Sequence, residues 1–137
     1  MRTKDSSVNN KAFTLYFTPM LAPNYTYKAK ITAITDADSF TALVDCGFHI
    51  NKTIKIRLFG IDAPEIRGIE REEGLKAKDY VASLILNKEV IIKTYKDPKD
   101  KYGRWLAEII GDFGEGNPKN LTSFLLSKGI GHPYFGD

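Results

Sequence analysis

An arginine and two carboxylates stand close together in one short segment of the sequence. Arg57 is followed by Asp62 and then by Glu65, in the run RLFGIDAPE. The odd offset from Arg57 to Asp62 places them on opposite faces of a continuous strand, so one site can use both only if the chain bends near Gly60. Glycine permits that bend, and Pro64 stiffens the loop that presents the carboxylates.

A third acidic group that could serve the same site is Asp38. Crowded carboxylates repel one another, and a hard divalent cation with oxygen ligands relieves that repulsion. A metal site made by Asp38, Asp62 and Glu65 is therefore one interpretation. The alternative is that Asp36 and Asp38 only form a turn, as aspartate often does, and that the segment of Asp62 and Glu65 is an ordinary proline loop.

A second candidate segment is DKYGRWLA, which begins at Asp100. It places Arg104 at the start of an expected strand, beside Lys101 and Tyr102. A guanidinium group can hold two oxygens of a phosphoryl centre and stays charged at any relevant pH. Phosphate chemistry is one interpretation of this segment, and a solvated charged loop is the other.

These side chains need elements that position them, and the pattern of apolar residues predicts which. Period-two alternation predicts strands over residues 25–35, 39–46, 52–59, 89–95 and 103–110. In the first strand the expected inward residues are Tyr25, Tyr27, Ala29, Ile31 and Ala33.

A change to a period of about 3.6 predicts a helix over residues 72–87. Its apolar face is expected to consist of Leu75, Tyr80, Val81, Leu84 and Ile85. A second helix is expected over residues 120–128, stopped by Gly129. This order predicts the OB-fold, an antiparallel five-stranded barrel with a helix inserted after strand three and a C-terminal helix. Fold alone does not fix function.

The chain's length and composition are those of one folded domain. It has 137 residues, of which 42% are hydrophobic and 27% charged. We expect an N-terminal leader or arm over residues 1–24, partly flexible, and the OB-fold domain over residues 25–137. The single cysteine, Cys46, excludes an internal disulfide and is expected to be buried on the second strand.

The net charge of +3 suits a polyanionic partner without requiring one. No apolar run is long enough to span a bilayer, so we expect no membrane insertion. The apolar stretch of residues 12–22 is interrupted by threonine and proline, which favours a cytoplasmic location over export.

Together the motifs RLFGIDAPE and DKYGRWLA resemble the staphylococcal nuclease (thermonuclease) family, across roughly residues 25–134. The resemblance implies a calcium-dependent nuclease that cuts DNA and RNA with little sequence specificity and leaves a 3′-phosphate. It implies catalytic roles for Arg57, Glu65 and Arg104. The implied calcium ligands are Asp38, Asp62, the backbone carbonyl of Ala63 and, through water, Glu65. The implied contacts to the nucleotide are Lys101, Tyr102 and Tyr134.

One turn departs from the family pattern, which usually reads Asp-Gly-Asp-Thr. Here it reads Asp36-Ala37-Asp38-Ser39. If the turn requires a positive φ at Ala37, alanine would cost about 1 kcal/mol there and could displace Asp38.

Two rival functions stay open at this point. A noncatalytic OB-fold module would bind nucleic acid without cutting it, and a protein-interaction module would do neither. We expect a monomer that acts on single-stranded DNA or RNA, with His49 and His132 in structural or exposed roles.

Overall fold

The computed structural model describes residues 24–95 and 100–135. The long elements are strands β1 (Thr26–Asp36), β2 (Ser39–Asp45), β3 (Asn51–Leu58), β5 (Glu89–Tyr95) and β6 (Trp105–Gly111) and helices α2 (Arg71–Ile85) and α3 (Leu121–Ser127). The short elements are β4 (Gly60–Asp62), the 3-10 turn η1 (Gly68–Glu70), β7 (Lys119–Asn120) and β8 (His132–Tyr134). Neither helix is long and apolar enough to cross a membrane.

The five long strands form a closed barrel. Strands β3, β2, β1, β5 and β6 pair in that order and antiparallel. The ring closes where β3 meets β6, and this pair is parallel. The predicted five-stranded OB-fold barrel is thus confirmed. It is mixed and not wholly antiparallel, because β6 runs alongside β3 in the same direction.

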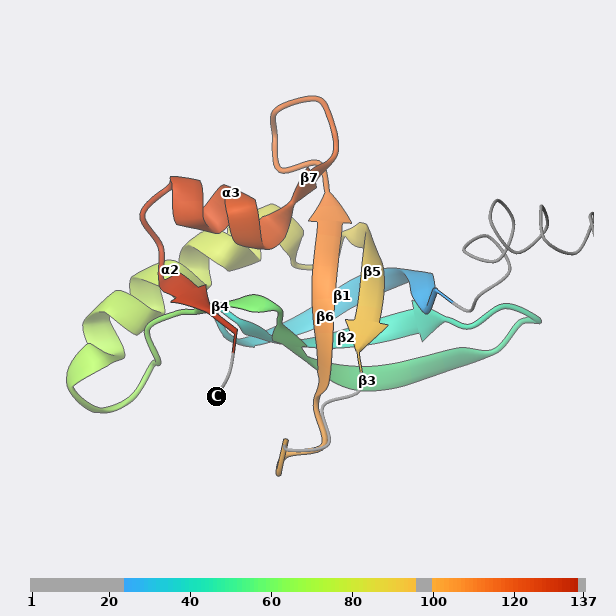
Figure 1. Ribbon diagram of the computed structural model, residues 1–137, viewed down its shortest axis with the longest axis horizontal. Helices are drawn as coiled ribbons and strands as arrows, with labels where there is room; N and C mark the ends of the chain where they lie inside the picture. The colour runs from blue at the N-terminus through green and yellow to red at the C-terminus, as the bar shows by residue number, and fades with distance from the viewer. Residues whose placement is uncertain (1–23, 96–99, 136–137) are drawn as a thin grey trace, which may run out of the picture.

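Both helices lie on the same side of the barrel, at the left of Figure 1. Helix α2 buries Gly74, Ala77, Val81 and Ile85, and helix α3 buries Leu121, Phe124 and Leu125. Apart from Gly74, these residues join the inward-facing side chains of the strands in one core. The predicted helices at 72–87 and 120–128 are confirmed within one or two residues at each end.

A β-bulge in β1 changes which residues face inward. The pairing of β1 with β2 shifts between Ile31 and Ala33, and again between Ile34 and Asp36. A bulge adds a residue to one strand and reverses the alternation beyond it. Ala33, expected inside, is therefore exposed, while Ile34 packs against the core and Asp36 is only 8% exposed. Tyr25, also expected inside, precedes the strand and is exposed.

The prediction that Cys46 is buried is wrong. It follows the last paired residue of β2 and is exposed, in the part of the β2–β3 hairpin that reaches away from the core at the right of Figure 1.

The expected cost at Ala37 does not arise, because Ala37 is not among the residues with positive φ and is fully buried. Residues 1–23 of the predicted N-terminal arm lie outside the described residues.

Helix α2 touches the loop of Glu65 at one glycine. A Cβ atom on Gly74 would overlap the backbone carbonyl of Glu65. We therefore predict that Gly74→Ala lowers the free energy of unfolding by about 1–3 kcal/mol, although alanine is intrinsically the better helix former by about 1 kcal/mol. Urea denaturation measures this change, with Asp79→Ala on the exposed side of the same helix as the control. A stabilised Gly74→Ala variant would contradict the close packing.

Candidate active site

The bend predicted at Gly60 is present and brings Arg57 to the start of the next strand. Gly60 has φ of +88°, and β3 ends just before it at Leu58. The guanidinium Nη1 of Arg57 donates to the carbonyl oxygen of Ile61 at 2.7 Å and to that of Leu58 at 3.3 Å. Arg57 thereby ties the end of β3 to β4.

One guanidinium joins two of the predicted metal ligands. Arg57 Nη1 lies 3.1 Å from Asp38 Oδ2, and Nη2 lies 3.7 Å from Asp62 Oδ1. The side chains of Arg57 and Asp38 are 16% and 10% exposed, while that of Asp62 is 47% exposed. The ion pair between Arg57 and Asp38 is therefore largely buried, whereas the side chain of Asp62 is exposed to solvent.

Arg104, from the second motif DKYGRWLA, is linked to Asp38 through the hydroxyl group of Ser39. Arg104 Nη1 donates to Ser39 Oγ at 3.2 Å, and Ser39 Oγ donates to Asp38 Oδ1 at 3.3 Å. The carboxylate of Asp100 braces Arg104, accepting from Nε at 3.0 Å and from Nη2 at 2.9 Å. Both arginines and both aspartates, Asp38 and Asp62, thus belong to one connected network.

Two tyrosines predicted to contact substrate lie against these arginines. The Tyr134 ring centroid is 5.7 Å from the guanidinium carbon of Arg57, and the Tyr102 centroid is 5.1 Å from that of Arg104. Tyr134 arrives through the pairing of β8 with β4, where it stands opposite Gly60. Both rings are exposed, at 42% and 69%, and Lys101 is exposed beside Tyr102.

Glu65 stands apart from this network. It lies in the loop between β4 and η1, and its side chain is exposed. Its backbone N–H donates to Glu70 Oε1 at 3.4 Å, and Gly74 packs against its carbonyl group. Glu65 takes no part in the contacts that join Asp38, Asp62 and the two arginines. The structure therefore fixes the backbone of Glu65 and leaves its carboxylate to solvent.

Comparison with known proteins identifies the family of this chain. Residues 55–136 match the family described as staphylococcal nuclease homologue. The chain belongs to this family. The match includes Arg57, Asp62, Glu65 and Arg104, while Asp38 lies before it.

Three relatives illustrate the range of proteins to which the chain is similar. An uncharacterized protein of Methanocaldococcus jannaschii is 31% identical over 132 residues, covering 79% of this chain and 59% of that protein. A micrococcal nuclease of Shigella flexneri is 28% identical over 112 residues, covering 79% of this chain and 59% of that protein. An endonuclease of Bacillus subtilis is 25% identical over 118 residues, covering 80% of this chain and 9% of that protein. The chain thus spans three fifths or less of these relatives.

The oxygen donors at the site suit a hard divalent cation. Burial raises the pKa of Asp38 although the guanidinium of Arg57 lowers it, so the negative charge of Asp38 is incompletely compensated. A cation beside Asp38 and Asp62 would complete that compensation, and the carbonyl of Ala63 is a further oxygen of the kind that calcium accepts. Among residues 24–95 and 100–135, no three carboxylate, histidine or cysteine side chains already gather as a metal cluster.

Sequence reasoning missed the residues that brace the site. Ser39 links the two motifs, and Asp100 orients Arg104. Asp36 accepts from the backbone N–H of Ile66 at 3.3 Å and so holds the loop after β4. The spacing of Asp100 and Arg104, four residues apart, was the available signal for their pairing, whereas the link through Ser39 depends on strand register. His132, expected to be structural or exposed, is exposed, with Nε2 3.6 Å from Asp62 Oδ2.

The raised pKa of Asp38 has a consequence for stability in the presence of a chelator. Above the unfolded-state pKa, about 3.9, ionised Asp38 destabilises the folded protein, and below it both states are protonated and the penalty vanishes. An asparagine side chain in its place would carry no charge and could still accept from the N–H of Ala63. We predict that the melting temperature of the wild type rises relative to that of Asp38→Asn as the pH falls from 7 toward 4, because Asp38 takes up a proton in this range and asparagine does not titrate. Thermal melts across this range test it, and a difference that does not change with pH would contradict it.

Proposed function

We propose that this staphylococcal nuclease homologue hydrolyses the phosphodiester bonds of DNA and RNA in a calcium-dependent reaction. The observation that carries the proposal is the network from Arg57 through Asp38 and Ser39 to Arg104. With Asp62, whose side chain opens to solvent, it gathers two guanidinium groups and two carboxylates in one place. Relatives named micrococcal nuclease and endonuclease support the same activity.

The two arginines would bind the phosphate. Each guanidinium offers several N–H donors in a plane, and the negative charge on phosphate oxygens grows as a nucleophile adds. Because Asp100 holds Arg104 in place, little reorganisation is needed when substrate arrives. Tyr102 and Tyr134, exposed beside the arginines, offer flat surfaces on which a nucleoside can stack.

Calcium would be held by Asp38, Asp62 and the carbonyl oxygen of Ala63. When bound, it supplies charge neutralisation at a phosphate oxygen and a place for the attacking water. Glu65 would accept the proton of that water as the new P–O bond forms. The bond to the 5′ oxygen breaks, that oxygen takes up a proton, and a 3′-phosphate remains. Glu65 must turn toward the site to do this, which its exposed position permits.

Nothing in the described residues around the site resembles an element that enters a duplex groove to recognise a sequence. The arginines and tyrosines contact features that every nucleotide has, which favours cleavage of single-stranded DNA or RNA with little sequence specificity. We propose that the domain acts as a monomer.

The deciding experiment incubates labelled single-stranded DNA with the protein in calcium, in magnesium and in chelator. We expect cleavage in calcium only. Arg104→Ala should lower kcat about 10²–10³-fold by removing a charge-stabilising group, and Glu65→Gln about 10²–10⁴-fold by removing the base. Arg67→Ala and Glu72→Gln, exposed residues of the same region, are matched controls that should retain activity.

A noncatalytic binding module gives a different result. It would leave the DNA intact in all three conditions and retain it with an affinity that falls as salt rises and ignores calcium. A protein-interaction module would neither cut nor retain the DNA. Either result with the wild-type protein would overturn the proposed activity.

A further inference from the structure

A separate hollow lies beside the candidate site, on the far side of Asp62 from Arg57. One carboxylate oxygen of Asp62 faces Arg57, at 3.7 Å, and the other faces His132, at 3.6 Å, which lines the hollow. The hollow has a volume of about 480 Å³ and is bounded by the loop after β4, the start of α2 and residues 129–132. That volume falls within the range of small-molecule pockets, about 300–1,000 Å³.

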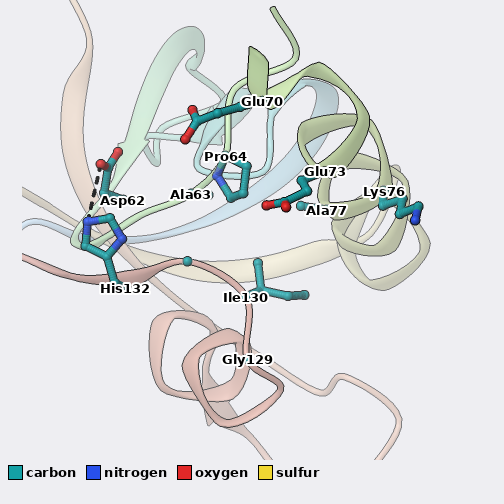
Figure 2. Close-up of a pocket in the computed structure, with 11 residues that line it drawn as sticks. Asp62, Ala63, Pro64, Glu70, Glu73, Lys76, Ala77, Gly129, Ile130 and His132 are labelled. Carbon is teal, nitrogen blue, oxygen red and sulfur yellow. Dashed lines mark ion pairs between the residues drawn. The ribbon is translucent and has the colours of Figure 1, made fainter. Parts of the chain in front are cut away.

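The lining of the hollow combines apolar surface with hydrogen-bond acceptors. Figure 2 shows Pro64, Ala77 and Ile130 around it, with the carboxylate of Glu73 directed toward Pro64 and that of Glu70 directed toward the Asp62 side. Within the described part of the chain neither glutamate takes part in a salt bridge. Of the two, Glu70 accepts one weak bond, from the N–H of Glu65 at 3.4 Å. Most of their capacity to accept hydrogen bonds therefore remains free.

This lining selects a particular kind of ligand. Ionised carboxylates only accept hydrogen bonds, so a matching ligand must present N–H donors. The lining carries three carboxylates, those of Asp62, Glu70 and Glu73, against one ammonium group, that of Lys76. This excess of negative charge repels a phosphate group, whereas the apolar walls favour a flat uncharged ring. Because Asp62 forms a wall shared with the candidate phosphate site, a ring in the hollow could remain joined to a phosphate at Arg57.

We propose that the hollow binds the nucleobase next to the phosphate that is cut, and prefers a base with an exocyclic amino group, cytosine or adenine. This inference rests on the proposed nuclease function. The amino group at position 4 of cytosine or position 6 of adenine donates to a glutamate, in the pairing that proteins use to recognise cytosine N4. Uracil and thymine place an oxygen at that position, which the carboxylate repels. Glu73 is the residue that makes this distinction, since Glu70 also braces the loop of Glu65.

The test compares cytosine with uracil, rings of the same size that differ at position 4. Deoxydinucleotides carry one of the two bases on one side of the phosphate and thymine on the other, in both orders. In calcium, the wild type should show a kcat/KM about tenfold higher for cytosine than for uracil in one of the two orders. In Glu73→Gln that ratio should fall below about twofold, because the amide also offers an N–H donor to the uracil oxygen. Glu72→Gln, the same change one residue away and outside the hollow, should keep the full ratio.

A binding measurement separates this inference from the nuclease proposal. In chelator, fluorescence anisotropy should show tighter binding of oligo(dC) than of oligo(dU), with the difference lost in Glu73→Gln and kept in Glu72→Gln. If the wild type cuts neither single-stranded DNA nor a dinucleotide, the proposed activity fails, but this binding difference still supports the base pocket. Equal binding of both oligonucleotides, or a cytosine preference unchanged in Glu73→Gln, would overturn the inference.

Discussion

The site depends on one largely buried arginine and the groups that surround it. Arg57 contacts Asp38, Asp62 and the carbonyl oxygens of Leu58 and Ile61. A charge removed from water must be matched by an opposite charge and by hydrogen bonds, or the folded state is destabilised by several kcal/mol. Arg57 meets this requirement only if β3 ends, the chain bends and the next strand returns toward it. The electrostatic requirement of one side chain therefore fixes the backbone of the site.

The acidic turn after β1 supports this arrangement from the other side. Asp38 accepts from the backbone N–H of Ala63 at 2.9 Å, and Asp36 accepts from that of Ile66. Two carboxylates of one turn thus hold the loop that carries the remaining acidic residues. Close approach of glycines completes the fit, since a Cβ atom on Gly131 would lie 2.6 Å from the carbonyl oxygen of Asp62. The loop is positioned by backbone contacts, which leaves its side chains available for chemistry.

Most of the barrel could be predicted because alternation and helical periodicity are properties of single segments. The bend at Gly60 was equally local, since an odd spacing between Arg57 and Asp62 required it. The bulge in β1 was not predictable in this way, because it depends on how β1 and β2 pair, and it is the reason that Asp36 is buried. The same limit applies to Ser39, which acquires its role only when strand register sets it opposite Arg57 and within reach of Arg104.

The site residues fall into the same two groups, those that a single segment of sequence indicates and those that depend on packing between distant segments. Motif spacing indicated Arg57, Asp62 and Arg104, and the turn between the first two strands indicated Asp38. The structure brings all four into one network. Spacing could not show that Glu65 faces solvent, because the orientation of a loop side chain follows from its packing against other elements. Nor could it show the hollow beside Asp62, whose walls come from α2 and from residues 129–132.

The most direct test of this account is a crystal structure of the protein with calcium and a dinucleotide whose phosphodiester resists hydrolysis. We expect calcium bound to Asp38 and Asp62, with one phosphate contacted by both Arg57 and Arg104. A phosphate bound elsewhere, or held by only one of the two arginines with no cation at the aspartates, would contradict it.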